Sequence, residues 1–179
     1  MNTQHFSLQP FTGGAPVPPF AITGAITRSG THLTITYNLT GSLQDLVIAP
    51  PTDKPARRWV LWETTCFEFF LAIPETTAYW EFNLSPAGHW NLFRLADYRQ
   101  GIQEEPALQV LPLTVNRQPE RLTLTLNCNL ASLISPHSPL EVAISTILQH
   151  QDGRLSFWAL THPGPEPDFH HQDGFSLTL

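Results

Sequence analysis

The chain has 179 residues, of which 41 % are apolar and only 13 % are charged, and its formal net charge is -6. This length is enough for one domain with a full hydrophobic core, so we expect a single domain over residues 1–179. Acidic residues outnumber basic ones and no basic stripe occurs, which argues against binding to nucleic acid or to an anionic membrane surface.

The first ten residues, MNTQHFSLQP, lack the cationic segment followed by an apolar run that is typical of a signal peptide. No stretch approaches the ~20 apolar residues of a membrane span. We therefore expect a cytoplasmic protein. Cys66 and Cys128 lie in alternating apolar runs, which predicts two buried thiols rather than a disulfide or a metal-ligand pair.

Alternation of apolar and polar residues predicts strands in the first part of the chain. In residues 31–41 (THLTITYNLTG) Leu33, Ile35 and Tyr37 share one face with Leu39, while threonines occupy the other face. Residues 20–30 (FAITGAITRSG) are expected to form the hairpin partner, with RSGTH as the turn.

The middle of the chain follows a different pattern, because residues 65–73, 78–85 and 89–99 are apolar on both faces. Such strands are covered on both sides, by another sheet or by a ligand and its loops. The segments PETT and PAGH are expected to be the turns between them.

Alternation returns at residues 120–130 and 139–148, and Asp152-Gly153 predicts a two-residue hairpin turn after the second of these. The only helix candidates, residues 45–50 and 129–134, are shorter than two turns. Together these patterns predict an all-β protein of roughly ten to twelve strands, an antiparallel β-sandwich or jelly roll with little helix.

Glu68 is the first candidate functional residue, because it is a carboxylate in an otherwise apolar strand. A buried carboxylate must be paired or hydrogen-bonded. One interpretation is a structural ion pair with Arg94 or Arg99 from a neighbouring strand. The other is a ligand contact, with Asn83 or Arg94 supplying a nearby amide or guanidinium.

Trp62 lies in a loop-like segment six residues before Glu68, where packing alone does not require a tryptophan. An indole ring beside polar groups suits a sugar, whose C–H groups stack on the ring while its hydroxyls reach the polar atoms. Trp80 and Trp90 alternate with Phe82 and Leu92, so we expect these two in the core.

The C-terminal stretch HPGPEPDFHHQDGF contains His162, Asp168, His170, His171 and Asp173. Adjacent histidines on an extended chain point in opposite directions, which disfavours one shared metal, and no HxH pair is present. The favoured interpretation is a structured loop or the rim of a ligand pocket. A metal site and a catalytic His–Asp pair are the alternatives.

The segments LWETTCFEFFLA and AYWEFNLSPAGHWNLFRLADYRQG resemble the DOMON-like β-sandwich domains, an uncharacterised bacterial branch of them in particular, which are similar to family 9 carbohydrate-binding modules. The resemblance implies that Trp62 stacks on a sugar and that Glu68 accepts from its hydroxyls. It also implies an amide and a second aromatic residue near the C-terminus, where this chain offers Phe169, His170 and His171 and no tryptophan after Trp158.

Haem-binding DOMON domains hold iron between a methionine and a histidine. The only methionine of this chain is Met1, so that ligation does not apply, while bis-histidine ligation stays open.

The resulting hypothesis is a non-catalytic domain that binds a carbohydrate or a similar polyol, with no catalytic residue and no metal. The alternatives are a metal-dependent enzyme that uses the C-terminal His/Asp cluster, and a carrier of haem or another cofactor at His162, His170 and His171. The expected ligand-binding residues are Trp62, Glu68, Asn83, Arg94, His162, Asp168, His170 and His171.

Overall fold

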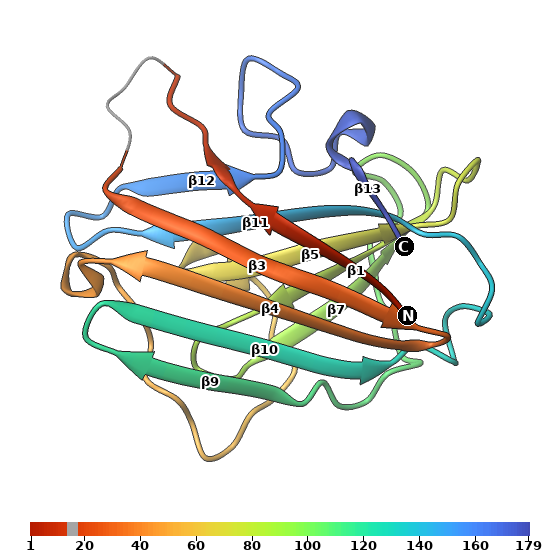
Figure 1. Ribbon diagram of the computed structural model, residues 1–179, viewed down its shortest axis with the longest axis horizontal. Coiled ribbons are helices and arrows are strands. Elements are labelled where there is room, and N and C mark those ends of the chain that lie inside the picture. Colours follow the sequence, from red (N-terminus) through yellow and green to blue (C-terminus); the bar gives the residue numbers. More distant parts are fainter. Residues whose placement is uncertain (14–17) are drawn as a thin grey trace.

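The computed structural model describes residues 1–13 and 18–179, and in them it consists of two antiparallel sheets stacked face to face (Figure 1). The first sheet contains, in spatial order, β1 (Asn2–Ser7), β3 (Phe20–Ser29), β4 (His32–Gly41), β10 (Arg121–Asn129) and β9 (Leu113–Gln118). The second sheet contains β2 (Gln9–Pro10), β12 (Leu155–Ala159), β11 (Glu141–Gln149), β5 (Cys66–Ala72), β6 (Tyr79–Leu84), β7 (Trp90–Leu95) and β8 (Gln103–Glu104), and β13 (Leu177–Thr178) pairs with β11. The predicted all-β sandwich is therefore confirmed.

Helix is limited to three 3₁₀ turns of three residues each within the described part: η1 (Leu43–Asp45), η2 (Leu61–Glu63) and η3 (Gln172–Gly174). The two helix candidates from the sequence were wrong. Of residues 45–50 only Asp45 belongs to η1 and the rest form no helix, while after Asn129, the end of β10, the chain forms a turn in which the Leu130 carbonyl accepts from the amides of Leu133 and Ile134. In residues 1–13 and 18–179 no helix has the length and apolar character needed to cross a bilayer.

Both predicted hairpins are confirmed. In the first, Ser29 pairs with His32 across a two-residue turn, and Gly30 has a φ of 60°, which glycine adopts without strain. In the second, Gln149 pairs with Leu155 and the His150 amide donates to the Arg154 carbonyl. This loop therefore has three residues, not two, and Gly153 takes the left-handed position that such loops require.

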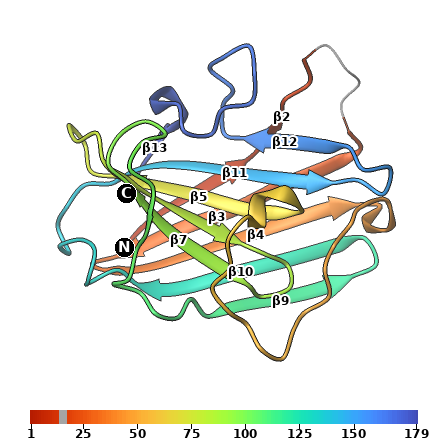
Figure 2. The ribbon, with the colours of Figure 1, turned by 180° about the vertical axis from the view of Figure 1, so that it is seen from behind.

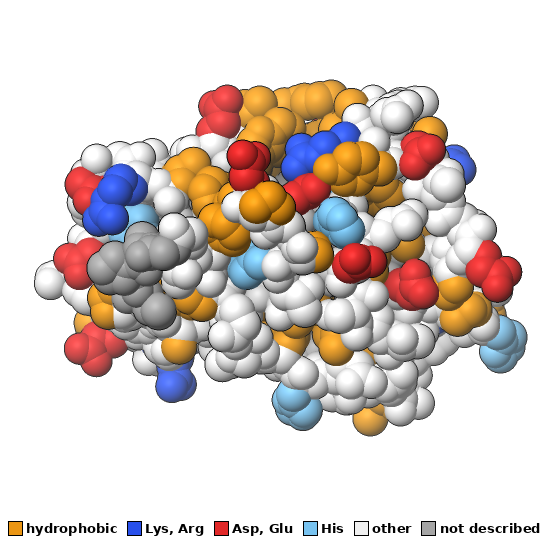
Figure 3. Space-filling view, turned by 90° about the horizontal axis from the view of Figure 1, so that it is seen from above, with side chains coloured by type: hydrophobic (Ala, Val, Ile, Leu, Met, Phe, Trp, Pro, Cys, Tyr) orange, Lys and Arg blue, Asp and Glu red, His pale blue; other side chains and the backbone are white. Residues whose placement is uncertain are grey.

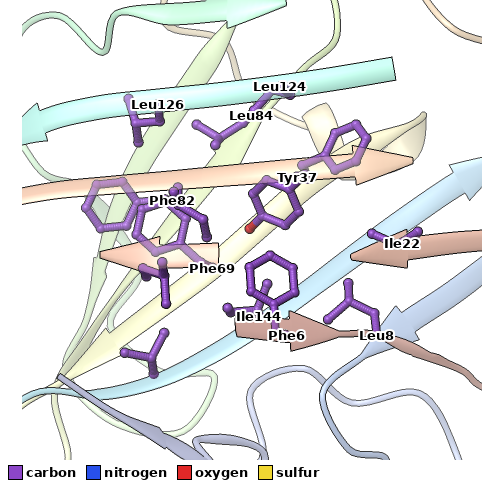
Figure 4. Packing of buried hydrophobic residues seen from close by; sticks show 14 of the residues in the cluster. Phe6, Leu8, Ile22, Tyr37, Phe69, Phe82, Leu84, Leu124, Leu126 and Ile144 are labelled. Atoms are coloured by element: carbon purple, nitrogen blue, oxygen red, sulfur yellow. The ribbon is translucent and has the colours of Figure 1, made fainter. Parts of the chain in front are cut away.

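The core lies between the sheets and is built from the faces that alternation predicted. Leu33, Ile35, Tyr37 and Leu39 are all fully buried. Figure 4 shows Tyr37 of this face in the same cluster as aromatic side chains of the second sheet such as Phe69. The phenol of Tyr37 reaches across the core, where its hydroxyl donates to the backbone carbonyl of Glu68 at 2.7 Å. This buried hydrogen bond links the first sheet to the central strand of the second.

The second sheet is covered on both faces, as the middle of the sequence predicted. Its inner face, which is directed toward the first sheet, carries Phe67, Phe69 and Leu71 of β5. Its outer face carries Cys66, Glu68 and Phe70, and no third sheet packs there among the described residues. Figure 2 shows this side of the molecule, where long connecting segments take the place of a further layer.

Gly24 in β3 is required by close packing. A Cβ atom at this position would lie 2.0 Å from the Thr36 carbonyl oxygen and 2.4 Å from the Phe6 ring, which lies over the glycine. A side chain at position 24 would therefore push β3 away from β4 and displace the Phe6 ring.

We predict that Gly24→Ala lowers the free energy of unfolding by about 3 kcal/mol or more, at the upper end for overpacking, because backbone atoms cannot yield as a flexible side chain does. Urea unfolding followed by tryptophan fluorescence measures this. Gly174→Ala is the matched control, since a Cβ atom there meets nothing within 4 Å. Equal effects of the two substitutions would contradict the packing argument.

Candidate ligand-binding site

Three connecting segments cover the outer face of the second sheet and border a pocket of about 420 Å³ that is open to solvent on one side. They are residues 47–65, which carry η2, the loop 96–102 after β7, and the C-terminal segment 160–176. The wall of this cavity, which we call the outer pocket, consists of Trp62, Glu68, Glu81, Leu95, Arg99, Ile102, Ile147, Phe157, Pro167, Phe169 and His170. Figure 3 looks down on the end of the molecule nearest the C-terminal segment, where hydrophobic side chains gather beside basic and acidic ones.

Arg57 fixes the first covering segment to the sheet. Its guanidinium lies 4.4 Å over the ring of Trp90 and donates to the Asn91 side-chain oxygen and to the backbone carbonyls of Leu92, Glu105 and Leu108, at 3.0, 3.2, 3.0 and 2.6 Å. The amide of Asn91 in turn donates to the Arg58 carbonyl at 3.0 Å. The segment is thereby attached to β7 without strand pairing over most of its length.

Trp62 reaches the pocket through a strained turn. Val60, a β-branched residue, has φ 54° and ψ 32°, the left-handed conformation that such residues rarely adopt. The turn places both Trp59 and Trp62 edge-on against Phe93, with ring centroids 4.8 and 6.0 Å away. Trp62 forms one wall of the outer pocket, while half of Trp59 stays exposed.

Glu68 lies on the floor of the pocket, and Asn83, its cross-strand partner in register, lies beside it on the same face of the sheet. The Ser145 hydroxyl donates to the Glu68 carboxyl at 3.1 Å, and the Asn83 amide donates to Glu81 at 2.9 Å. The Cys66 thiol donates to the Asn83 oxygen at 3.7 Å. All of these side chains are buried, and together they form a polar row in an otherwise apolar face.

Burial of two carboxyls near each other decides where the negative charge lies. Removal from water, and then the neighbouring Glu81, raise the pKa of Glu68 from 4.5 to about 8. Burial also raises the pKa of Glu81, but the hydrogen bond from Asn83 and the charge of Arg99 offset part of this. Glu68 therefore keeps its proton at neutral pH, whereas Asn83 and Arg99 favour the charged form of Glu81.

A second group of hydrogen bonds fixes the C-terminal segment to the loop 96–102. Asp168 accepts from the Arg99 guanidinium at 2.8 Å, from the Tyr98 hydroxyl at 2.5 Å and from the His170 amide at 3.1 Å. Burial alone would raise the pKa of Asp168, but these hydrogen bonds outweigh it and hold the pKa below its usual value. The His170 ring lies against Tyr79 and Phe70.

The structure brings part of the expected site together. Trp62, Glu68 and His170 line one pocket, Asn83 holds Glu81 in its floor, and Asp168 positions Arg99 in its wall. Sequence reasoning did not select Glu81 or Phe157 as site residues, and it considered Arg99 only as an ion-pair partner of Glu68. Glu81 had a visible signal, since it alternates with Asn83 on the same strand.

Arg94, His162 and His171 are not in the outer pocket. Arg94 pairs in register with Trp80 and is exposed at the inner-face side of β7, so it neither lines the pocket nor pairs with Glu68. The Nε2 atom of His162 donates to the Gln9 carbonyl at 2.8 Å. The Nδ1 atom of His171 accepts from the Asp173 amide at 3.2 Å and so caps η3.

The C-terminal histidines thus have separate partners. In the described part of the chain no group of three or more His, Cys, Asp or Glu side chains is arranged to hold a metal ion. Cys66 and Cys128 are buried free thiols, as predicted.

A larger groove of about 930 Å³ lies between residues 11–12 and 18–20 on one side and the hairpin β11–β12 on the other, and it shares Phe157 and Pro167 with the outer pocket. It contains neither of the buried carboxyls nor a tryptophan. We therefore place the candidate site at the outer pocket, where polar groups converge on an apolar cavity.

Comparisons with known proteins bear on the fold. The sequence matches no protein-family model, and no curated protein matches it. A solved structure from Bacteroides uniformis, described as a "putative carbohydrate-binding protein", matches with a TM-score of 0.69 at 14 % identity over 98 % of this chain and 84 % of its own. A family 9 carbohydrate-binding module from Caldicellulosiruptor kristjanssonii, solved in complex with cellotriose, matches with a TM-score of 0.53 at 9 % identity over 88 % of this chain and 72 % of its own. The chain shares the fold of these proteins.

We predict that Glu68→Gln flattens the pH dependence of stability between about pH 4.5 and pH 8. The folded state keeps the Glu68 proton up to a pKa of about 8, whereas the unfolded carboxyl loses it near 4.5. The free energy of unfolding of the wild type therefore falls as pH rises through this window. Glutamine has no proton to lose and still offers an oxygen to Ser145. Urea unfolding at a series of pH values measures the slope.

The control is Glu63→Gln, because Glu63 is exposed in η2 and should leave the slope of the wild type unchanged. Identical slopes for Glu68→Gln and the wild type would mean that Glu68 is charged in the folded protein.

Proposed function

We propose that the chain, acting as one unit, binds a carbohydrate or a similar polyol in the outer pocket and does no chemistry on it. The observation that carries the proposal is that Trp62 and Glu68, six residues apart, form the wall and the floor of one cavity. A flat aromatic ring beside hydrogen-bonding groups is the arrangement that recognises a sugar ring. The volume of about 420 Å³ is within the range of small-molecule sites.

The polar groups of the pocket suit hydroxyls. The Glu81 carboxyl group offers acceptor oxygens, the protonated Glu68 both donates and accepts, and the Arg99 guanidinium donates. A sugar hydroxyl is also both a donor and an acceptor, so neighbouring hydroxyls can satisfy these groups together. Phe157 and Phe169 supply further apolar surface for the C–H groups of the ring.

The structural neighbours support this proposal, since one was solved in complex with cellotriose and the description of the other names it a carbohydrate-binding protein. We do not propose a metal-dependent enzyme or a haem carrier, because His162, His170 and His171 have separate partners.

Isothermal titration calorimetry with glucose, cellobiose, cellotriose and a panel of other mono- and oligosaccharides tests the proposal. Saturable heat for at least one sugar supports it. Absence of binding across the panel would overturn it. Conversion of a bound sugar to product during incubation would overturn the claim that the chain does no chemistry on its ligand.

We predict that Trp62→Ala weakens binding of the best sugar by about 1–3 kcal/mol, roughly 5- to 150-fold, through lost stacking and burial. Folding should be little affected, because removal of a ring from an open pocket wall leaves no closed cavity. Calorimetry and thermal unfolding of the variant measure the two effects.

Trp80→Ala is the comparison variant, because Trp80 lies on the inner face and packs against the core. It should lower stability and leave affinity unchanged at temperatures where the variant is folded. The reverse pattern, with Trp80 controlling affinity, would place the site elsewhere.

A further inference from the structure

A chain of hydrogen bonds leads from the loop 96–102 to the ring of His170. The backbone amide of Arg99 donates to the Tyr79 hydroxyl at 3.2 Å, and that hydroxyl lies 2.8 Å from His170 Nδ1. Arg99 has a φ of 52°, a left-handed conformation that is uncommon for a residue other than glycine. In this strained conformation the Arg99 amide donates to the Tyr79 hydroxyl.

The chain of donors determines which ring nitrogen of His170 carries the proton. Tyr79 is buried, and its hydroxyl oxygen already accepts from the Arg99 amide. The hydroxyl proton needs an acceptor, and among the described residues Nδ1 of His170 is the one within hydrogen-bond distance. Nδ1 is then unprotonated, and the proton of the neutral ring is on Nε2.

The surroundings of His170 keep the ring neutral. Burial, and then the charge of Arg99, lower the pKa of His170 to about 4, against an opposing effect of Asp168. Burial likewise raises the pKa of Tyr79 to about 12, so the phenol keeps the proton that it donates. Phe70 is an apolar neighbour of the ring and brings no further charge to it.

The second nitrogen of the ring is free to act on a ligand. Within residues 1–13 and 18–179 Nε2 of His170 has no hydrogen-bond partner, and it is not sealed from solvent. The ring forms part of the wall of the outer pocket and of an adjoining cavity of about 320 Å³.

We propose that His170 is a ligand-binding residue that donates a hydrogen bond from Nε2–H to an oxygen of the bound sugar, and that Tyr79 is the positioning residue that fixes this tautomer. The inference rests on the proposed function, because it concerns the same pocket. The outer pocket then offers donors from Arg99 and His170 and an acceptor from Glu81, so it selects ligands by the direction of their hydroxyls as well as by their stacking surface.

Nitrogen-15 NMR of the full chain, labelled at histidine and recorded near pH 7, tests the tautomer without any ligand. The wild type should show His170 with an unprotonated Nδ1 and a protonated Nε2. Tyr79→Phe keeps the ring and removes the hydroxyl, so the signals should shift toward a mixture of tautomers. Tyr98→Phe is the matched control and should leave them unchanged, because the Tyr98 hydroxyl contacts Asp168 and not the ring. A protonated Nδ1 in the wild type would overturn the proposal that the Tyr79 hydroxyl donates to His170 and fixes its tautomer.

Titration with cellotriose, or with the best sugar from the panel, tests the ligand contact. Binding should perturb the Nε2 signal of His170, and both His170→Ala and Tyr79→Phe should weaken affinity by about tenfold, the usual effect of one lost hydrogen bond. Wild-type affinity in both variants would overturn the contact while leaving the proposed function intact. If no sugar binds the wild type, the proposed function and the contact between His170 Nε2 and the sugar both fail. The NMR signals then still test whether Tyr79 fixes the tautomer of His170.

Discussion

The outer face of the second sheet is apolar along most of its length, and the first sheet can cover only the other face. This constraint determines the rest of the structure. The outer face must be covered by connecting segments, since the chain forms no further sheet there in its described part. Segments without regular pairing need anchors of another kind, and the molecule uses guanidinium and carboxylate side chains at a few points. The outer pocket is the space that these anchored segments leave between them.

The polar row on the floor of the pocket is costly for stability and informative about function. Two carboxyls removed from water on adjacent strands would repel each other if both were charged, and each would lack hydration. Ser145, Asn83 and a retained proton reduce this cost without an ion pair at Glu68. A purely structural sheet would be better served by apolar side chains at these positions. The buried carboxyls in the floor of the pocket are therefore not explained by packing alone, and they are the residues on which the proposed function depends.

The sequence predicted the fold well, because period-two alternation reports directly which face of a strand is buried. The hairpins of β3–β4 and β11–β12 followed from this pattern, and the doubly apolar middle strands correctly indicated a sheet covered on both sides. The short helix candidates failed because one turn of apolar residues is equally compatible with a turn between strands. Arg57 could not be foreseen as an anchor, since its acceptors are carbonyls spread over residues 91–108.

The candidate site was predictable only where residues share a strand or its register. Glu68 and Asn83 are cross-strand partners, as their strands suggested, and Trp62, which was selected by its spacing from Glu68, lines the same pocket as Glu68. Arg94 was misplaced although the pattern could have shown its position, because it alternates with Trp90 and Leu92, which were assigned to the core, and so lies on the opposite face from Glu81. Arg99 and Phe157 reach the pocket from other parts of the fold, so no local signal identified them.

The two anchors of the pocket differ in how they respond to the solution. The acceptors of Arg57 are all neutral, so added salt has no partner charge to screen at the anchor of the segment that carries Trp62. The opposite wall depends on the ion pair of Arg99 and Asp168, in which the arginine side chain is 51 % exposed. Salt weakens that contact. The attachment of the segment that carries Trp62 is therefore expected to be insensitive to salt. The attachment of the C-terminal segment through Arg99 and Asp168 is expected to weaken as the ionic strength rises.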